Sequence, residues 1–355
     1  EDRENEGDMI MAAEFATPES IAFFLQHTSG VICVAVTPER AGELDLVPMV
    51  HRNTDSRRTA FLVTVDVAVG TTTGISATDR ANTIRALIDP ATRPADLRRP
   101  GHIFPLEARE GGVLKRAGHT EAAVDLARLA GCAPAGVLCE IVSASKADMA
   151  RRPELERFCE QHELRMISIA DLIRHRRSTE KLVRRVGHAP ITTTWGAFDC
   201  IAFESVLDGG VHLALVKGDP TASPGDAGLL VRVHSECAIG DVFGSNYCDC
   251  HRVLDAAMAR IDAEGAGVVV YLRGHEGRGL GITHTPDGAA VAGGMLDVEP
   301  SSDALEYGVG AQILTDLGVT RMRLMTNNTA RYNALEGFGL TILDRVALII
   351  ERTAR

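Results

Sequence analysis

The chain opens with an acidic segment, Glu1 to Asp8, in which five carboxylates surround a single arginine. Carboxylates at this density repel one another and raise one another's pKa unless a cation neutralises them, so the segment cannot pack as an ordinary apolar element. Oxygen ligands of this kind suit Mg²⁺ or Mn²⁺ better than zinc. Taken alone, the segment also fits the commoner interpretation of a solvated charge run. Other motifs decide between the two interpretations.

Two downstream segments, 99–106 and 111–122, each set a histidine beside a glycine, which lets a ligand approach the backbone closely. The apolar residues that follow the second segment have helical spacing. The turn from Arg116 to Thr120 is therefore predicted to lead into a helix N-terminus, where phosphate binds well. A lone histidine is more often structural than catalytic. Both turns, the acidic segment and the apolar run Gly136 to Glu140 together indicate a metal and sugar-phosphate site.

The second half carries a different constellation, in which Cys237, Cys248 and Cys250 offer three thiolates in one polar stretch. This is the arrangement of a catalytic zinc that keeps one coordination position open for water. Coordination by His234 or His251 would close that position and make the site structural. Buried cysteines without a metal are the alternative, but the Cys-x-Cys pair in a polar setting favours zinc.

An apolar run from Gly267 leads into the segment Tyr271 to Gly279, a glycine-rich turn that contains Arg273 and Arg278. A strand that runs into such a turn could receive a nucleotide. Turns of this kind more often only reverse the chain, so the signal is weak by itself.

The length of 355 residues exceeds one ordinary hydrophobic core and predicts two domains, 1–176 and 186–355. Between Asp171 and Lys181 an apolar pattern gives way to basic and polar residues, which indicates a helix C-terminus followed by a linker. Just upstream, Met166 to Ile169 is predicted to be the last strand of the first domain. Further predicted elements are strands at Phe61 to Val67 and Val268 to Tyr271 and a helix at Val253 to Ile261. The fold class is therefore α/β (α+β), with a mixed sheet and packed helices in each domain.

Composition excludes several classes of partner. A net charge of -11 argues against nucleic acid and against an anionic membrane surface. Eight cysteines without a disulfide-like framework, no apolar run long enough to span a bilayer and no visible signal peptide predict a reducing, cytoplasmic location.

Three long motifs cover the first half: 28–33 (Thr-Ser-Gly-Val-Ile-Cys), 47–50 (Val-Pro-Met-Val) and 73–83 (Thr-Gly-Ile-Ser-Ala-Thr-Asp-Arg-Ala-Asn-Thr). With the acidic segment and the Gly-His turns, they make residues 1 to about 176 resemble 3,4-dihydroxy-2-butanone 4-phosphate synthase. That riboflavin-pathway enzyme converts ribulose 5-phosphate to the four-carbon phosphate and formate. The resemblance also implies a homodimer, and a helix and a strand ahead of the acidic segment.

The same resemblance implies roles for individual residues. Glu4 and His119 are expected to hold the Mg²⁺ or Mn²⁺ ions, and His102 and Glu140 are expected to be essential to turnover. The residues expected to bind ribulose 5-phosphate are Arg3, Glu4, Asp8, Arg116, Ala117, Gly118, His119, Thr120 and Glu140. The chemistry suits these residue types, because deprotonation to an enediol needs a proton shuttle and a Lewis acid that holds vicinal oxygens. On sequence alone, Glu140 also fits a strand-edge glutamate in a salt bridge.

The second half resembles GTP cyclohydrolase II from about Val186 to Val346, and the order of the two halves matches the fused bifunctional proteins. The resemblance rests on the thiolates and on the segments 308–319 and 324–328. It implies a GTP-like site at Arg232, Val233, His234, Ser235, Glu236, Glu276, Gly277, Arg278, Asp303, Thr326 and Arg331.

This half also departs from the family pattern. The arginine that the family uses as its nucleophile is Leu305, the expected glutamine is Val253, and the proline and lysine expected after the Thr-Asn-Asn motif are Thr329 and Arg331. The connection 282–290 is short and rich in helix breakers, and the C-terminal segment is shorter than the resemblance implies.

We therefore expect a degenerate second domain that binds zinc and has weak GTP binding or none. Two alternatives stay open. The protein is fully bifunctional and also hydrolyses GTP to the diaminopyrimidine, formate and pyrophosphate, or the second domain is a regulatory or dimerisation module.

Overall fold

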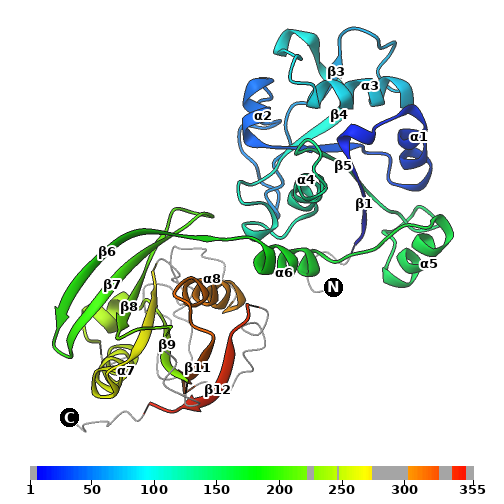
Figure 1. The fold of residues 1–355 in the computed structure, drawn as a ribbon. Helices are drawn as coiled ribbons and strands as arrows, with labels where there is room; N and C mark the ends of the chain where they lie inside the picture. Colours follow the sequence, from blue (N-terminus) through cyan, green and yellow to red (C-terminus); the bar gives the residue numbers. More distant parts are fainter. Residues whose placement is uncertain (1–5, 222–227, 246–247, 274–302, 328–337, 349–355) are drawn as a thin grey trace. The chain divides into compact units, whose positions relative to one another are not determined.

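The computed structural model describes residues 6–221, 228–245, 248–273, 303–327 and 338–348 (Figure 1). Its contacts divide the chain into two units, Glu1–Arg176 and Arg177–Arg355. Each unit is built on one mixed sheet with packed helices, which confirms the predicted class. The division falls within helix α6 (Ile169–Thr179), which continues through the basic residues of the predicted boundary before it ends.

The first unit contains a five-stranded sheet in the order β1-β5-β2-β4-β3. The strands are β1 (Asp8–Ala12), β2 (Cys33–Val36), β3 (Val65–Val67), β4 (Leu97–Glu107) and β5 (Gly136–Glu140). Strand β1 runs antiparallel to β5 with Asp8 opposite Glu140, and β2 runs parallel to β4 with Cys33 opposite Phe104. The predicted strand Phe61 to Val67 is only partly formed, since β3 begins at Val65.

Both faces of this sheet are covered, because successive strand residues point to opposite sides. The unit's helices before α6 are α1 (Pro18–His27), α2 (Pro38–Glu43), α3 (Ala77–Ile88), α4 (His119–Leu129) and α5 (Arg152–His162). Cys33 and Ala35 of β2 pack with α4, whereas Val34 and Val36 lie in the core that α1 and α3 complete. The N-terminus of α4 is thereby fixed beside the sheet.

The second unit contains a seven-stranded sheet in the order β12-β11-β9-β10-β8-β7-β6. The strands are β6 (Val183–Thr193), β7 (Gly196–Ser205), β8 (Val211–Lys217), β9 (Leu229–Ser235), β10 (Gly267–Leu272), β11 (Arg321–Met325) and β12 (Thr341–Val346). Strands β9 to β12 pair in parallel, and β6, β7, β8 and β10 pair antiparallel. Helix α7 (Cys250–Glu264) packs against Leu230 and Val269, and α8 (Asp303–Asp316) packs on the opposite face against Val231 and Val270.

Helical periodicity predicted α4 and α7 correctly, and the apolar run predicted β10 correctly. The strand predicted at Met166 to Ile169 is wrong, because residues 164–168 form no regular structure and Ile169 begins α6. Met166 and Ile167 are 45% and 56% exposed, so this apolar run has no core to pack against. Among the described residues, no helix combines the length and apolar character that a bilayer crossing requires.

Candidate metal and substrate sites

The first unit brings a carboxylate pair and a histidine together at one end of its sheet. Side-chain ligand atoms of Glu6, Asp8 and His119 all lie within 4.8 Å of one another, and Asp8 Oδ1 is 3.6 Å from His119 Nδ1. Two carboxylates and one imidazole form a donor set that fits a hard divalent cation such as Mg²⁺ or Mn²⁺. The predicted ligand Glu4 and the predicted substrate residue Arg3 lie outside the described residues.

Glu6 was not singled out from the sequence. A signal was present, because residues two apart point to the same side of an extended chain, and Glu4, Glu6 and Asp8 alternate in this way. The partner His119 lies more than a hundred residues later, and only the fold brings it to Glu6 and Asp8.

Glu140 lies next to this cluster, since it ends β5 directly opposite Asp8. The Ser29 hydroxyl donates to Glu140 Oε2 at 2.9 Å, and the Ser29 amide donates to the Glu140 carbonyl at 2.8 Å. These two bonds fix both the backbone and the carboxylate of Glu140. Ser29 lies within the 28–33 motif, but sequence reasoning gave it no role.

The turn 116–120 leads into α4 as predicted, with Gly118 at its N-cap. The Arg116 guanidinium donates to Glu121 Oε2 at 2.7 Å, and Glu121 Oε1 accepts the Arg109 amide at 3.0 Å. Glu121 is 1% exposed, so the charge of Arg116 is matched by a buried carboxylate. The turn therefore offers an anion chiefly the amides at the helix N-terminus, while Arg116 holds the turn in shape. Direct contact of Arg116, Ala117 or Thr120 with substrate stays a prediction.

His102 forms a pair with a carboxylate in another part of the same sheet. Its Nδ1 lies 2.7 Å from Asp66 Oδ2, and its amide donates to Asp66 Oδ1 at 2.9 Å. The loop at Gly74 packs directly on this pair, because a Cβ there would lie 2.0 Å from Asp66 Oδ2 and 2.5 Å from His102 Nδ1. Strand β2 lies between the strands of His102 and Glu140, so their backbones are about 10 Å apart across the sheet.

The second unit gathers the three predicted thiols. Ligand atoms of Cys237, Cys248 and Cys250 lie within 4.8 Å of one another, and the sulfurs of Cys237 and Cys248 are 3.7 Å apart. Burial raises the pKa of the Cys237 and Cys250 thiols, so a cation is needed to hold them as thiolates at neutral pH. Gly240 leaves room for the sulfurs, since a Cβ there would lie 2.6 Å from Cys248 Sγ. Soft sulfur donors in this number fit zinc.

Neither candidate histidine joins the thiols. His234 Nε2 lies 3.1 Å from Asp241 Oδ2, which also accepts the Cys237 amide at 2.9 Å and the Tyr271 hydroxyl at 2.8 Å. His251 is paired with Asp255 at 3.2 Å. Asp241 thus orients the segment that carries the first thiol, a role that sequence reasoning missed.

The predicted GTP-like residues are described only in part. Residues 232–235 belong to β9, Arg232 donates to the Met325 carbonyl at 3.0 Å, and Glu236 lies 3.8 Å from Arg273. The Thr326 amide donates to the Val346 carbonyl at 3.0 Å. Glu276, Gly277, Arg278 and Arg331 lie outside the described residues, as does the connection 282–290. Asp303 and Leu305 lie in helix α8, of which the structure describes only the backbone at these two positions.

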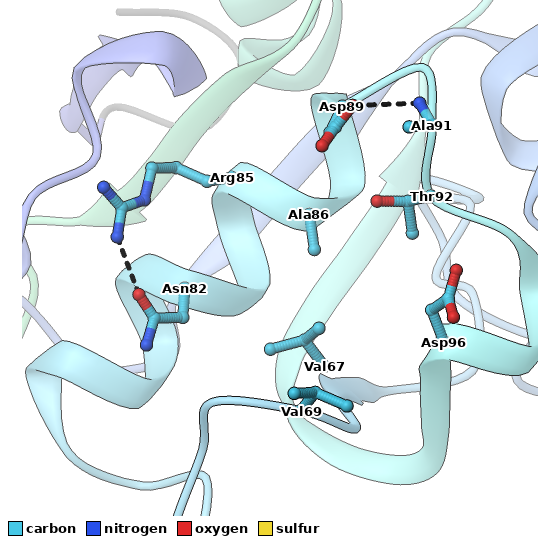
Figure 2. Close-up of a pocket in the computed structure, with 9 residues that line it drawn as sticks. All are labelled: Val67, Val69, Asn82, Arg85, Ala86, Asp89, Ala91, Thr92 and Asp96. Carbon is cyan, nitrogen blue, oxygen red and sulfur yellow. Dashed lines mark hydrogen bonds between the residues drawn. The ribbon is translucent and has the colours of Figure 1, made fainter.

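A hollow of about 460 Å³ lies between α3, β3 and the loop after α3 (Figure 2). Two hydrogen bonds form among its lining residues: Arg85 donates to Asn82 at 2.7 Å, and Asp89 accepts the Ala91 amide at 2.9 Å. None of its lining residues belongs to the predicted sites.

Two family models match the chain: 3,4-dihydroxy-2-butanone 4-phosphate synthase over residues 1–175 and GTP cyclohydrolase II over residues 184–347. A riboflavin biosynthesis protein of Salinispora arenicola is 54% identical over 98% of this chain and 83% of its own length. A bifunctional riboflavin biosynthesis protein of Arabidopsis thaliana, described as chloroplastic, is 52% identical over 98% of this chain. The chain spans 65% of that relative and 66% of a rice relative.

A similar solved structure covers both units. It is a two-domain 3,4-dihydroxy-2-butanone 4-phosphate synthase from A. baumannii, which is 39% identical with a TM-score of 0.73 and covers 97% of this chain and 93% of its own.

Proposed function

We propose that this chain converts D-ribulose 5-phosphate to the butanone phosphate and formate. It belongs to the family of riboflavin biosynthesis proteins that join a 3,4-dihydroxy-2-butanone 4-phosphate synthase domain to a GTP cyclohydrolase II domain. The observation that carries the proposal is the cluster of Glu6, Asp8 and His119, with Glu140 opposite Asp8. A sugar phosphate bound there would meet metal ligands, a carboxylate for proton transfer and a helix N-terminus for its phosphate.

The residues of the first unit have complementary parts in this chemistry. Glu6, Asp8 and His119 would hold a Mg²⁺ or Mn²⁺ ion, which would polarise vicinal sugar oxygens and stabilise the enediolate charge. Glu140, whose carboxylate accepts a hydrogen bond from Ser29, would take and return a proton. With the Asp66 carboxylate as acceptor, His102 would donate from Nδ1 and would exchange a proton through Nε2.

Formate release from ribulose 5-phosphate tests this proposal. We expect the full chain to release formate with Mg²⁺ or Mn²⁺. Formate release should stop after treatment with EDTA and should recover when either ion alone is added back. A pure, folded protein that releases no formate with either ion would overturn it.

For the second unit we propose a zinc-binding domain that has lost GTP cyclohydrolase II activity. The support is the intact set of three cysteines together with the sequence departures, above all leucine at position 305, because leucine can neither attack a phosphate nor balance its charge. The A. baumannii protein of similar two-unit fold is named only as a synthase. About one zinc per chain by elemental analysis, with no product from GTP, is the expected result.

The bifunctional enzyme is the second candidate, and relatives named bifunctional favour it. It predicts formate and pyrophosphate from GTP, so one assay separates the two. Restoring arginine at position 305 alone should not create activity, because catalytic residues that act as a unit are not additive.

A regulatory or dimerisation role for the second unit is compatible with the loss of GTP chemistry. We propose a homodimer in the reducing cytosol, an environment that fits eight free cysteines. Sedimentation of the full chain with and without its zinc tests whether the second unit contributes to assembly. An unchanged mass after zinc removal would argue against a zinc-dependent role in dimer formation.

A further inference from the structure

We infer that Arg80 is a positioning residue that connects the loop packed against His102 to the turn that holds Glu140. This inference rests on the proposed synthase function and extends it to a residue outside the predicted substrate-binding and metal-binding sets. Arg80 belongs to α3, on the side of that helix that faces the sheet, and is 7% exposed.

The first half of the link is the loop 72–75. The Arg80 Nε donates to the Ile75 carbonyl at 3.0 Å. Directly before it, Gly74 has a φ of +89° and lies so close to Asp66 and His102 that a Cβ would collide with both side chains. Asp79 fixes the same loop, since it accepts the amides of Thr72 and Gly74, each at 3.0 Å. A shift of this loop therefore moves the wall against which the Asp66–His102 pair rests.

The second half of the link is the turn at 28–30. The Arg80 Nη1 donates to the Gly30 carbonyl at 3.3 Å. The preceding residue, Ser29, makes the two hydrogen bonds that hold the Glu140 carboxylate and backbone. A single rigid guanidinium thus joins two loops, one against His102 and the other against Glu140.

The energetics support a positioning role for this cation. Burying a guanidinium is costly unless it is well paired. Within the described part of the chain, no ion pair to Arg80 is formed, and its hydrogen bonds go to the two backbone carbonyls. Burial lowers the pKa of the Arg80 guanidinium. A buried guanidinium that donates to the carbonyls of two loops restrains the position of both loops.

Arg80→Gln tests the inference in the full chain. We expect kcat for formate release to fall between about tenfold and about 10²-fold, because small misplacements of catalytic groups have effects of this size. KM for ribulose 5-phosphate and the Mg²⁺ dependence should stay within about twofold of the unmodified protein, since the cluster at Glu6, Asp8 and His119 is untouched. Arg80→Lys keeps the charge but not the planar guanidinium, so its kcat should lie between that of Arg80→Gln and that of the unmodified protein.

The matched control is Arg85→Gln on the same helix. Arg85 is exposed and donates to Asn82 at 2.7 Å in the hollow shown in Figure 2, so its loss should change neither kcat nor KM. A purely structural role for Arg80 would lower the melting temperature and leave kcat intact well below that temperature. That result, or an Arg80→Gln effect matched by Arg85→Gln, would overturn the inference.

A second measurement separates this inference from the proposed function. The ¹⁵N resonances of the His102 ring report the hydrogen bond from Nδ1 to Asp66 and need no substrate. We expect them to move in Arg80→Gln and to stay in place in Arg85→Gln. If the unmodified chain is inactive but the resonances still move in Arg80→Gln, the synthase proposal is refuted and the link between the two loops stands. If the resonances do not move in Arg80→Gln, the link is refuted.

Discussion

The two ligand clusters are assembled by different routes. In the first unit, Glu6 and Asp8 at the start of the chain meet His119 at the start of α4, so the sheet must bring distant segments together. In the second unit, Cys237, Cys248 and Cys250 all come from the short segment that follows β9 and enters α7. One cluster depends on the whole fold of its unit, and the other depends on a local segment.

Their surroundings differ as well. In the oxygen and nitrogen cluster, Asp8 lies opposite Glu140, whose carboxylate accepts a hydrogen bond from Ser29. Beside the thiols, the Asp241 carboxylate makes hydrogen bonds with His234, with the Tyr271 hydroxyl and with the Cys237 amide. The first cluster therefore joins groups from several elements of its sheet, whereas the thiols are gathered by one segment.

Removing one thiolate should give the largest effect. Cys250→Ser is expected to lose zinc, and with it much of the roughly 10 kcal/mol or more of apparent binding free energy that a thiolate zinc site can contribute. Elemental analysis and thermal unfolding measure both consequences. Cys200→Ser is the control, because Cys200 lies in β7 of the same unit outside the thiol cluster. Full zinc content in Cys250→Ser would show that Cys250 is not needed to bind the metal.

Changing the proton-transfer carboxylate should give the next largest effect, confined to the first unit. Glu140→Gln removes a group that can exchange a proton, so kcat for formate release should fall by about 10²- to 10⁴-fold. The zinc content should not change. In Cys250→Ser the synthase rate should stay near that of the unmodified chain, and a rate near normal in Glu140→Gln would contradict its assigned role.

Two glycine substitutions form a matched pair with smaller effects. Gly74→Ala places a methyl group against Asp66 and His102 at a φ of +89°, so it should lower formate release and cost about 1–3 kcal/mol of stability. Gly240→Ala places a methyl group against the sulfurs of Cys248 and Cys237, so it should lower zinc content instead. If each variant changed the property assigned to the other, the two clusters would not have the separate roles proposed here.

The smallest expected effect concerns pH. Hydrogen bonds from the Thr72 hydroxyl and amide, and from the Gly74 amide, lower the pKa of Asp79. A carboxyl whose pKa is lowered by folding stabilises the fold above its unfolded value of about 3.9, and this contribution is lost as pH falls through the folded pKa. Asp79→Asn should therefore melt below the unmodified protein at neutral pH, with a difference that shrinks below about pH 4. A difference that does not change with pH would show that ionisation of Asp79 plays no part.

The sequence by itself determined much that is local. Helical spacing and a Gly-His turn predicted α4 and its N-terminus, and the Cys-x-Cys pair with Cys237 predicted the thiol cluster, because these features lie within one segment. The same local reasoning gave a strand at Met166 to Ile169, which is wrong because an apolar run forms a strand only where a sheet is available to pair with it.

Only the tertiary structure decided the rest. Strand register placed Asp8 opposite Glu140, and the packing of α4 on the sheet placed His119 beside Glu6. Ser29 and Arg80 gained their partners in the same way, through contacts between residues far apart in the chain. Spacing along a sequence fixes which side chains share one helix or loop, but the pairing of distant strands depends on how all the apolar faces of a unit are buried together.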